Sequence, residues 1–478
     1  MLQPRVMVGK PPQDAPHVSV AIIGAGACGL VAAITLRDAG IDCVLPERDA
    51  RPAGSTALSS GFIPAPGTKV QREARINDSP EQFARDIQAK AHNTAAPHLV
   101  KAYSEAIGPA IDSLQALHAI DFIVLDGFLY PGHSVRRMHA VPDKTGAALV
   151  AQLERAALAA GADILCDAKV IDLWVDTSQR ITGVSYARPD GGTEYLRCDA
   201  LLLACNGFGG NAALVSELLP EMAGALFAGH TGNDGSAIAW GRALGARTAD
   251  LQGYQGHGSW AVPQGALITW ALMMEGGVQL NVRGERFHDE TQGYSEAAVH
   301  VLAQPGGVAW NVFDGEILKL ARGFPDFCDA EVAGAVKVCA DLSALAALIG
   351  CNTTDLIATY NRNHWASGIN DREKQVFSDV KGYVDARAFK RPLTAPFYAV
   401  KVTGALFHTQ GGLDIDDQCR VLRDDGTPLP NLLAAGGAAR GVSGNAVWGY
   451  LSGNGLLSAV AGGAIAAKTI AQLLKEAT

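Results

Sequence analysis

The sequence predicts an α/β fold. Near the N-terminus, a strand, a glycine turn, a helix and a second strand follow one another, a pattern typical of a parallel sheet covered by helices. The 478 residues exceed one ordinary domain, which indicates two domains or one domain with a large insertion. Hydrophobic residues make up 48% and charged residues 18% of the chain, as in a globular protein with a sizeable core.

The first element is the segment 18–47. An apolar strand, 18–23, runs into Gly24-Ala-Gly26-Ala-Cys-Gly29, an apolar helix follows, and a second strand, 41–45, leads to Glu47. In such a pattern the first glycine makes the turn, the second admits a pyrophosphate and the third lets helix and strand pack. The helix N-terminus holds the negative charge, and the acid accepts hydrogen bonds from ribose hydroxyls. The segment therefore predicts dinucleotide binding.

The next segment, RPAGSTALSSG at 51–61, resembles the glycine-serine loop of flavoproteins of the fumarate reductase, succinate dehydrogenase and 3-ketosteroid dehydrogenase superfamily. Segments 200–211, 231–235, 406–416, 431–444 and 449–467 resemble the same family in the same order. The resemblance covers nearly the whole chain. It implies a Rossmann-like, glutathione-reductase-like FAD-binding domain of residues 1–252 and 391–478, with an inserted α+β cap domain at residues 253–390. The cap opens at the turn LQGYQGHG, and helices such as LSALAALI and TDLIATYNRNHW follow.

The resemblance also implies noncovalent FAD and its contacts. The loop 51–61 lies along the flavin and pyrophosphate, Asp234 meets the ribityl region, and the final helix points its N-terminus toward the flavin pyrimidine. The family commonly has glutamate at the position of Gly437, so one flavin contact is missing or supplied otherwise. The residues expected to contact FAD are Gly24, Gly26, Cys28, Gly29, Glu47, Arg48, Ser55, Thr56, Ser59, Gly61, Val170, Ala204, Cys205, Gly207, Asp234, Gly436, Gly437, Asn454, Gly455, Leu456 and Leu457.

One tyrosine carries the proposed proton transfer. In the family's fumarate reductases an arginine stands four residues after the glutamate that corresponds to Glu290, and it gives the proton to the substrate. The ketosteroid dehydrogenases carry a tyrosine there, and this chain has Tyr294. Tyrosine has an unperturbed pKa of roughly 10, so it acts as a base only where a donor or positive charge stabilises the phenolate. The resemblance implies that Tyr294 moves the proton; the alternative is a tyrosine that packs in the cap.

The closing loop, the glycine-rich chain from residue 431 to the start of the final helix, supplies the expected donors to a ketone oxygen. Tyr450 and Ser452 resemble the Tyr-x-Ser arrangement of the Δ4 ketosteroid dehydrogenases, and Gly453 is assigned to the substrate through its backbone. The alternative for Tyr450 is an aromatic lid on the isoalloxazine. His257 and His408 match substrate histidines of the fumarate reductases, and the alternative for each is a structural histidine.

The charged clamps of the dicarboxylate enzymes are missing. Their proton-relay glutamate and arginine fall at Trp270 and Met273, and their closing-loop arginine has no counterpart near Leu451. Arg440 either meets a single substrate carboxylate or caps the turn. The preferred interpretation is an FAD-dependent dehydrogenase or reductase acting on a CH–CH bond α,β to a ketone, such as a 3-ketosteroid or an oxo-cyclohexane acid. The alternatives are an enoate reductase or tricarballylate-type dehydrogenase, and a non-enzymatic flavin sensor.

Composition excludes several partners. The net charge of −9 argues against nucleic acid, which needs a basic surface. We expect no membrane span, because no apolar run approaches its length, and no secretory signal at the N-terminus. Nine scattered cysteines without metal-type spacing fit reduced thiols in a cytoplasm. A small-molecule substrate and an external electron acceptor of unknown identity are expected, since no haem-binding C-x-x-C-H is present.

Overall fold

The computed structural model describes residues 4–126, 129–362 and 391–477. The chain divides into two compact units. The first comprises Met1–Ala223, Gly229–Gln255 and His408–Thr478, and the second Gly224–Ala228 and Gly256–Phe407. The end expected for the cap, residue 390, lies outside the described residues, as does the end of the segment TDLIATYNRNHW.

A largely parallel sheet forms the centre of the first unit. Its path through the described residues is β1-β8-β9-β10-β2-β3-β7, and β21 joins β10 on one side and β20 on the other. Strands β10, β2, β3 and β7 run parallel to one another, and β9 is antiparallel to both of its neighbours. The strands are β1 Arg5–Val8, β2 His17–Ile23, β3 Cys43–Pro46, β7 Asp163–Leu165, β8 Lys169–Val175, β9 Ile181–Ala187, β10 Thr193–Leu203, β20 Arg420–Leu422 and β21 Pro428–Ala434.

Helices and two small sheets complete this unit. Strands β4 Ile63–Pro64, β6 Met138–Ala140 and β5 Ile123–Val124 form one small sheet, and β12 Thr248–Ala249 pairs with β19 Gly412–Leu413 in the other. The α-helices are α1 Ala27–Asp38, α2 Gly54–Ala57, α3 Lys69–Glu73, α4 Pro80–Lys90, α5 Pro97–His118, α6 Gly146–Ala159, α7 Ala212–Leu218, α8 Ser236–Ala243 and α16 Asn454–Ala477. Short 3-10 turns are η1 Pro220–Met222, η3 Gly436–Ala438 and η4 Val447–Gly449.

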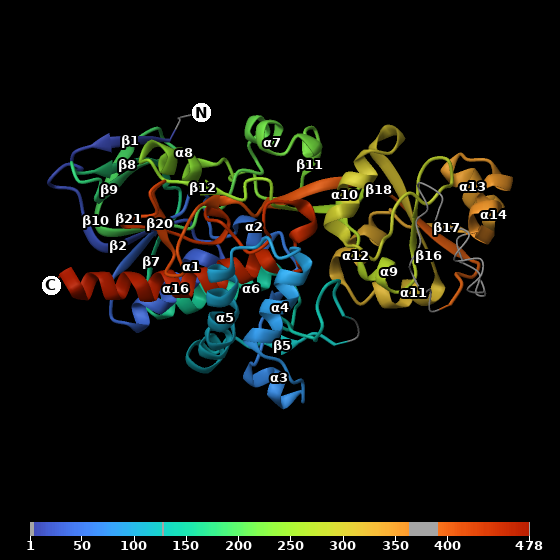
Figure 1. Ribbon diagram of the computed structural model, residues 1–478, viewed down its shortest axis with the longest axis horizontal. Coiled ribbons are helices and arrows are strands. Elements are labelled where there is room, and N and C mark those ends of the chain that lie inside the picture. The colour runs from blue at the N-terminus through green and yellow to red at the C-terminus, as the bar shows by residue number, and fades with distance from the viewer. Residues whose placement is uncertain (1–3, 127–128, 363–390, 478) are drawn as a thin grey trace. The chain divides into compact units, whose positions relative to one another are not determined.

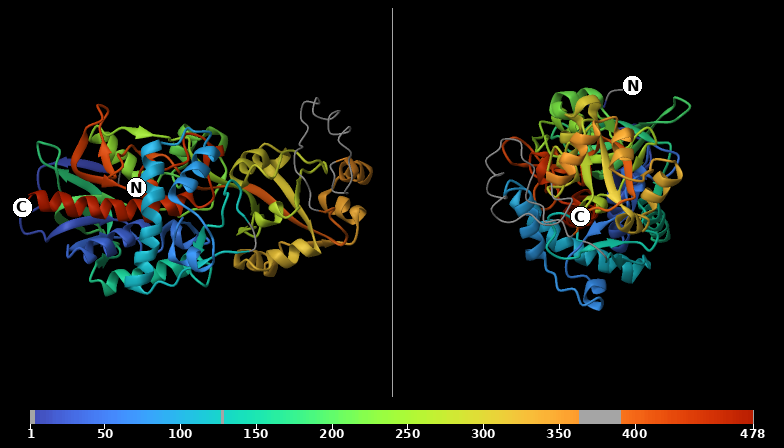
Figure 2. Two further views of the ribbon diagram at one scale, coloured as in Figure 1. Left: turned by 60° about the horizontal axis from the view of Figure 1, so that its bottom comes forward. Right: turned by 90° about the vertical axis from the view of Figure 1, so that its right-hand side faces the viewer.

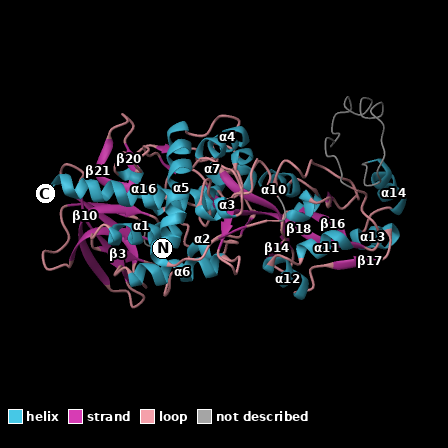
Figure 3. Ribbon diagram, turned by 90° about the horizontal axis from the view of Figure 1, so that it is seen from below, coloured by secondary structure: helices cyan, strands magenta, loops and turns pink. Residues whose placement is uncertain are grey.

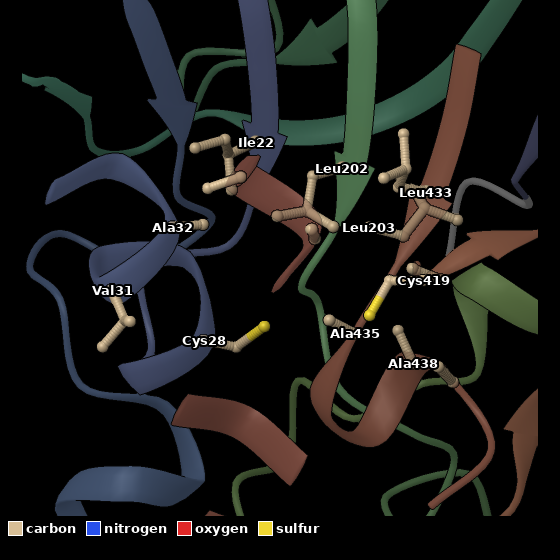
Figure 4. Packing of buried hydrophobic residues seen from close by; sticks show 14 of the residues in the cluster. Ile22, Cys28, Val31, Ala32, Leu202, Leu203, Cys419, Leu433, Ala435 and Ala438 are labelled. Carbon is tan, nitrogen blue, oxygen red and sulfur yellow. The ribbon is translucent and has the colours of Figure 1, made fainter. Parts of the chain in front are cut away.

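The core of the first unit lies between the sheet and two helices from opposite ends of the sequence. Helix α16 packs along α1, so the C-terminus closes the fold begun at the N-terminus (Figure 1). A Cβ on Gly463 would lie 2.5 Å from the Cys28 carbonyl oxygen, so the two helices approach as closely as glycine permits. In a second view α16, in red, crosses α5, in blue, with which it is also in contact (Figure 2). Side chains such as Ile22, Leu202 and Leu433 fill the space from three neighbouring strands (Figure 4).

Among the described helices, α16 taken singly is long and apolar enough to cross a membrane, although the sequence led us to expect no run of that length. The window that meets this test is 61% buried inside the protein. Its apolar residues face α1 and α5, which gives it the position of a core helix.

The second unit is a twisted sheet with short helices. Its strands follow the order β14-β13-β18-β16-β15, and β11 and β17 also pair with β18. Figure 3 labels several of these strands and the helices that accompany them. The strands are β11 Leu226–Phe227, β13 Tyr254–Ala261, β14 Ala266–Leu267, β15 Val278–Leu280, β16 Val308–Asp314, β17 Lys337–Cys339 and β18 Phe397–Thr409. The helices are α9 Ala271–Met274, α10 Tyr294–Leu302, α11 Gly315–Ala321, α12 Pro325–Val332, α13 Leu342–Ile349 and α14 Thr353–Arg362, with η2 Pro305–Gly307.

Two sequence expectations for this region have clear outcomes. The segment LSALAALI is helix α13, as its apolar spacing predicted. The prediction of a turn at LQGYQGHG is wrong for most of that segment, because strand β13 begins at Tyr254. A Cβ on Gly258 would lie 2.6 Å from the Ala297 backbone, so this glycine permits a close approach of helix α10 to the strand.

Candidate functional site

The glycine turn between β2 and α1 has the geometry that its sequence predicted. Gly24 has a φ of +103°, and a Cβ there would lie 2.8 Å from the Ala204 carbonyl oxygen. A Cβ on Gly29 would lie 1.9 Å from the Gly24 carbonyl oxygen. Neither position accepts a side chain. At Gly26 the nearest atom to a Cβ would be the Thr56 hydroxyl, 3.6 Å away, so here the glycine leaves room for a ligand to approach the backbone.

The start of α1 is suited to an anion. Gly26 is the N-cap and offers no side chain, and the first turn contains no acidic residue. Helix N-termini carry unpaired N–H groups and partial positive charge, which favour phosphate. Of these donors, Ala27 N–H points to the Thr56 hydroxyl at 3.2 Å. The turn and the loop carrying Thr56 therefore meet at the start of α1, an arrangement suited to a phosphate.

Glu47 is buried beside this turn. Its carboxylate accepts hydrogen bonds from Ala25 N–H at 2.7 Å and from Asp49 N–H at 3.1 Å. A carboxylate has about four acceptor positions, so it retains capacity for ribose hydroxyls. Glu47 thus holds the turn in place, and its contact with ribose hydroxyls stays a prediction.

The loop 51–61 is tied to its surroundings by short polar contacts. Ser59 Oγ donates to the Thr56 carbonyl at 2.7 Å and accepts from Gly61 N–H at 3.1 Å. Ser55 Oγ accepts from Asn233 Nδ2 at 2.9 Å, which joins this loop to the turn 231–235. The loop is therefore held to the turn 231–235 through Ser55 and to the start of α1 through Thr56.

Asp234 belongs to a charged group at the same end of the sheet. Its Oδ1 accepts a hydrogen bond from the N–H of Ser236, the first residue of helix α8, at 3.1 Å. Its Oδ2 lies 3.4 Å from Lys169 Nζ and 3.7 Å from Arg48 Nη1. The structure thus brings the predicted residues Arg48 and Asp234 together, and it adds Lys169, which no sequence motif indicated.

The family's glutamate position, Gly437, has a steric explanation. A Cβ on Gly437 would lie 2.1 Å from Asn206 Oδ1, so the Asn206 side chain occupies the space that a larger residue would need. Gly207 beside it is equally confined, because a Cβ there would lie 2.0 Å from Thr409 Oγ1. Ala204 and Cys205 are half-buried in the same turn.

The remaining residues expected to contact FAD include members of the core. Gly436 has a φ of +60°, and a Cβ there would meet Cys28 at 3.3 Å. Burial raises the pKa of the Cys28 thiol, so it is a neutral packing residue. Val170 and Leu457 are buried as well, and Leu456 is half-buried.

The first turns of α16 contain unsatisfied polar atoms. Asn454 Oδ1 and Ser458 Oγ are buried and form no hydrogen bond with any described residue. They are spaced i, i+4 and so share one helix face, and the first turn of this helix contains no acid. Buried polar atoms are normally paired, because leaving them unpaired costs about 1–3 kcal/mol each. These atoms fit a polar ligand at the helix N-terminus, where the sequence expected the flavin pyrimidine.

His408 lies beside Tyr450 in the first unit. Their rings are 5.5 Å apart at an interplanar angle of 74°, and a Cβ on Gly455 would lie 2.7 Å from His408 Nε2. Burial lowers the pKa of His408 to about 4, so its imidazole is neutral at pH 7. The structure therefore joins two predicted catalytic side chains at the start of α16.

A chain of side-chain hydrogen bonds determines which nitrogen of His408 carries the proton. Asn454 Nδ2 donates to Ser443 Oγ at 2.9 Å, and Ser443 Oγ donates to Gln410 Oε1 at 2.8 Å. This orients the Gln410 amide so that its Nε2 donates to His408 Nδ1 at 3.1 Å. Nδ1 also lies 3.3 Å from the Thr409 carbonyl, a longer contact than the one with Gln410. With the shorter contact as the hydrogen bond, Nδ1 accepts and the proton of the neutral ring is on Nε2, which is then a donor.

Sequence reasoning missed Gln410 and Ser443. Gln410 stands two residues after His408, and alternate residues of an extended segment lie on the same side of the chain. The spacing could therefore have indicated that Gln410 lies beside His408. Ser443 is 33 residues from Gln410 and carried no local signal.

Tyr294 lies in an aromatic set in the second unit. It is the first residue of α10, it is 9% exposed, and the ring of His257 stacks on it at 4.7 Å and 18°. Trp270 stands edge-on to both rings, and Phe407 contacts His257 at 5.5 Å. Phe407 and His408 are consecutive residues of β18.

His257 is a neutral donor as well. Its Nδ1 accepts from Ser259 N–H at 3.2 Å, which places the ring proton on Nε2. Burial lowers its pKa to about 3. The sequence left open whether His257 is structural or binds substrate, and its tautomer is compatible with donation to an oxygen.

The segment that precedes Tyr294 is anchored by a buried ion pair. Arg286 Nη2 and Glu290 Oε2 are 2.5 Å apart, and Glu290 Oε1 also accepts from Gln279 N–H at 2.9 Å. Trp270 Nε1 donates to the Glu290 carbonyl at 3.1 Å. Trp270, which stands where the dicarboxylate enzymes have a charge, thus supports the backbone next to the tyrosine.

Arg440 is engaged by two carboxylates. Its guanidinium lies 2.6 Å from Asp250 and 3.3 Å from Asp414. This geometry favours the second alternative from the sequence, in which Arg440 stabilises the turn. Ser452 and Gly453 follow Tyr450 in the closing loop, and Ser452 is buried.

Comparison with known proteins agrees with this geometry. The family described as FAD binding domain matches residues 19–456. A fumarate reductase (cytochrome) of Shewanella frigidimarina is 27% identical over 97% of this chain and 79% of its own length. The 4-oxocyclohexanecarboxylate 2-dehydrogenase of Sinomonas cyclohexanicum is 25% identical over 88% of this chain and 87% of its own.

A solved structure has the same fold. The 3-ketosteroid-Δ4-(5α)-dehydrogenase of Rhodococcus jostii RHA1 superposes with a TM-score of 0.75 at 22% identity, over 98% of this chain and 99% of its own. The predicted α/β FAD-binding fold and FAD as the cofactor are confirmed.

Proposed function

The chain belongs to the FAD binding domain family, and from that premise we propose that it oxidises a ring CH–CH bond α,β to a ketone, or reduces the corresponding enone. The protein is an FAD-dependent oxidoreductase acting on CH–CH bonds, as are its relatives. Substrates of the proposed class are 4-oxocyclohexanecarboxylate and 3-ketosteroids, which appear in the names of a relative and a structural neighbour.

The observation that carries this proposal is the neutral character of the rings around Tyr294. His257 is neutral because of its burial, and Trp270 is buried against both rings. Met273 is buried as well, and the resemblance places charges at 270 and 273 in the dicarboxylate enzymes. Arg440, the cation of the closing loop, is held in ion pairs. A ketone needs hydrogen-bond donors rather than a counter-charge, which suits these surroundings.

In this proposal Tyr450 and His408 bind the ketone oxygen. Its negative charge grows as the neighbouring carbon loses a proton, and fixed donors stabilise that charge. His408 presents Nε2–H because Gln410 holds Nδ1 as an acceptor. The backbone N–H of Gly453 is the third donor assigned by the resemblance.

Tyr294 takes the proton from the α-carbon, and in the reverse direction returns it. The β-carbon loses a hydride at the same time, so the two electrons and the second hydrogen leave together. FAD, when bound, supplies the acceptor for that hydride. The glycine turn, the loop 51–61 and the start of α16 hold the cofactor, and Asn454 and Ser458 provide the polar atoms that lack a partner.

Anaerobic bleaching of the flavin tests the proposal. We expect 4-oxocyclohexanecarboxylate or 5α-androstane-3,17-dione to reduce the bound flavin and succinate to leave it oxidised. Tyr294→Phe should lower kcat by about 10²–10⁴-fold with FAD still bound, since it removes a general acid–base. Tyr360→Phe is the matched control, because it removes a phenol that donates to the Leu393 carbonyl at 2.9 Å within the same unit. Equal turnover of Tyr294→Phe and this control would rule out the proton role.

A second candidate is an enoate reductase acting on a carboxylate. The observation in its favour is that His257 and His408 match histidines that bind carboxylate in the resembled fumarate reductases, and that a relative is a fumarate reductase. Reoxidation of a reduced dye by fumarate, with no response to a cyclic enone, would favour this candidate over the first.

A further inference from the structure

A buried charged group lies within the first unit, away from the glycine turn. Arg137 is 1% exposed. Its Nε and Nη2 donate to both oxygens of Asp78 at 2.8 and 3.0 Å, and its Nη1 donates to Asp86 at 2.5 Å. Burying a charge is costly unless it is paired and hydrogen-bonded. A buried arginine with two carboxylates is therefore rigid, because any movement would break several bonds at once.

This arginine also sets the protonation of a neighbouring histidine. Arg137 Nη1 is 3.1 Å from His133 Nδ1, and a guanidinium can only donate, so Nδ1 is an acceptor. The single proton of the neutral ring is then on Nε2, which donates to the Ser452 carbonyl at 2.9 Å. Burial and the Arg137 charge lower the pKa of His133 to about 4, so the ring stays neutral at pH 7. The partners of this last bond are 319 residues apart.

The backbone around Ser452 is in close contact with the same part of the unit. Gly453 has a φ of +88°, and a Cβ there would lie 2.6 Å from Pro64 Cδ on strand β4. A Cβ on Gly132 would lie 2.7 Å from the Leu451 side chain. The loop 450–453 therefore rests directly on β4 and on the segment that carries His133, with a hydrogen bond between them.

We propose that His133, oriented by Arg137, is a positioning residue that holds the loop 450–453 in the geometry its donors require. This inference rests on the proposed function, in which Tyr450 and the Gly453 backbone bind the ketone oxygen. His133 touches no reacting atom in this scheme. It acts through the Ser452 carbonyl, which fixes the peptide plane between Ser452 and Gly453 and hence the direction of the Gly453 N–H.

Three variants separate this role from simple stabilisation. His133→Phe keeps a ring against Phe83, with which His133 stacks at 6.1 Å and 22°, but has no N–H. His133→Gln restores a donor to the Ser452 carbonyl and an acceptor for Arg137. His139→Phe is the matched control, since His139 is also buried and also has a pKa lowered to about 4. Its ring nitrogens lie 2.7 Å from Thr68 Oγ1 and 2.9 Å from the Arg137 carbonyl.

The first measurement is hydrogen exchange of the FAD-loaded protein. The amides of Asn454 and Leu457 report on the loop, because they donate to the Leu451 carbonyl at 3.0 Å and the Gly453 carbonyl at 2.9 Å. We expect His133→Phe to accelerate their exchange by about tenfold. His133→Gln should restore most of the protection, and His139→Phe should leave these amides unchanged even where the melting temperature falls.

The second measurement is steady-state kinetics with 4-oxocyclohexanecarboxylate and a dye acceptor. Misplacing a donor by about 1 Å costs up to roughly 100-fold in rate, so we expect kcat/KM of His133→Phe to fall between 10- and 100-fold, with recovery in His133→Gln. Unchanged exchange in His133→Phe, or equal loosening in His139→Phe, would overturn the inference. Should no ketone be a substrate, the proposed function fails, while the exchange experiment still decides whether His133 holds the loop.

Discussion

The orientation of His408 by Gln410 leads to a quantitative prediction. Gln410→Leu removes the donor at 3.1 Å from His408 Nδ1 and leaves that nitrogen free to take the ring proton. The Thr409 carbonyl, 3.3 Å from Nδ1, would then accept a hydrogen bond from it. The ring would change tautomer, and Nε2 would become an acceptor that cannot stabilise a ketone oxygen.

The size of the effect follows from the one hydrogen bond that is removed. A neutral hydrogen bond contributes about 1 kcal/mol, and the Thr409 carbonyl lies near Nδ1 with or without the Gln410 amide, so losing the Gln410 bond shifts the tautomer equilibrium by about 1 kcal/mol. That difference corresponds to roughly fivefold, since about 1.4 kcal/mol is tenfold. We therefore expect kcat/KM for 4-oxocyclohexanecarboxylate to fall about fivefold. Gln410→Glu should reduce it further, because a carboxylate demands a proton on Nδ1.

The assay combines anaerobic flavin reduction with ¹⁵N chemical shifts of the histidine ring, which distinguish the two tautomers. Asn431→Leu is the control, because Asn431 is another buried amide of this unit, bonded to the carbonyls of Ile181 and Asp199 at 2.8 and 2.7 Å. It should lower the melting temperature without altering His408. The reasoning is refuted if Gln410→Leu retains the wild-type kcat/KM, or if the ring keeps its proton on Nε2.

Three further predictions concern the cofactor, the closing turn and pH. Asn454→Leu should weaken FAD binding by about tenfold, since it removes a buried amide from the start of α16; fluorescence titration of apoprotein with FAD measures this, and unchanged affinity would argue against the cofactor contact. Arg440→Gln should cost about 2 kcal/mol of unfolding free energy, because it removes the Arg440 partner of Asp250 and leaves Asp414 paired with Arg247 alone, with KM for the ketone unaltered; a raised KM at normal stability would instead place Arg440 on the substrate. Acid should destabilise the protein, because histidines whose folded pKa lies below the ordinary 6.5 stabilise it fully above pH 6.5 and progressively less as pH falls toward 4. The groups are His133, His139, His257, His288 and His408. Each of these histidines loses up to about 2 kcal/mol of its contribution to stability between pH 6.5 and pH 5. Equal urea midpoints at pH 7.5 and pH 5 would contradict this prediction.

The first strand, turn and helix could be predicted from the sequence because their causes are local. The Gly29 side-chain position faces the carbonyl of Gly24, five residues earlier, and Gly24 itself needs a positive φ. Such steric demands are met within one turn of chain, whatever the rest of the fold does. The same holds for α13, whose apolar spacing alone defined it, and the ordered series of motifs was enough to indicate the family and FAD.

Local reasoning could not supply the polar partners of the candidate site. The residues next to Arg440 in the sequence allowed either a substrate contact or a structural role in the turn. The structural role is favoured by Asp250, which pairs with Arg440 and is 190 residues away in the sequence. Ser443 sets the orientation of the Gln410 amide. Arg137 determines which ring nitrogen of His133 carries the proton, and that N–H donates to the Ser452 carbonyl. The sequence by itself determined where the backbone must turn and which residue types are available. Only the tertiary structure decided which donor meets which acceptor, because a hydrogen bond depends on contact in space and the chain brings distant segments together.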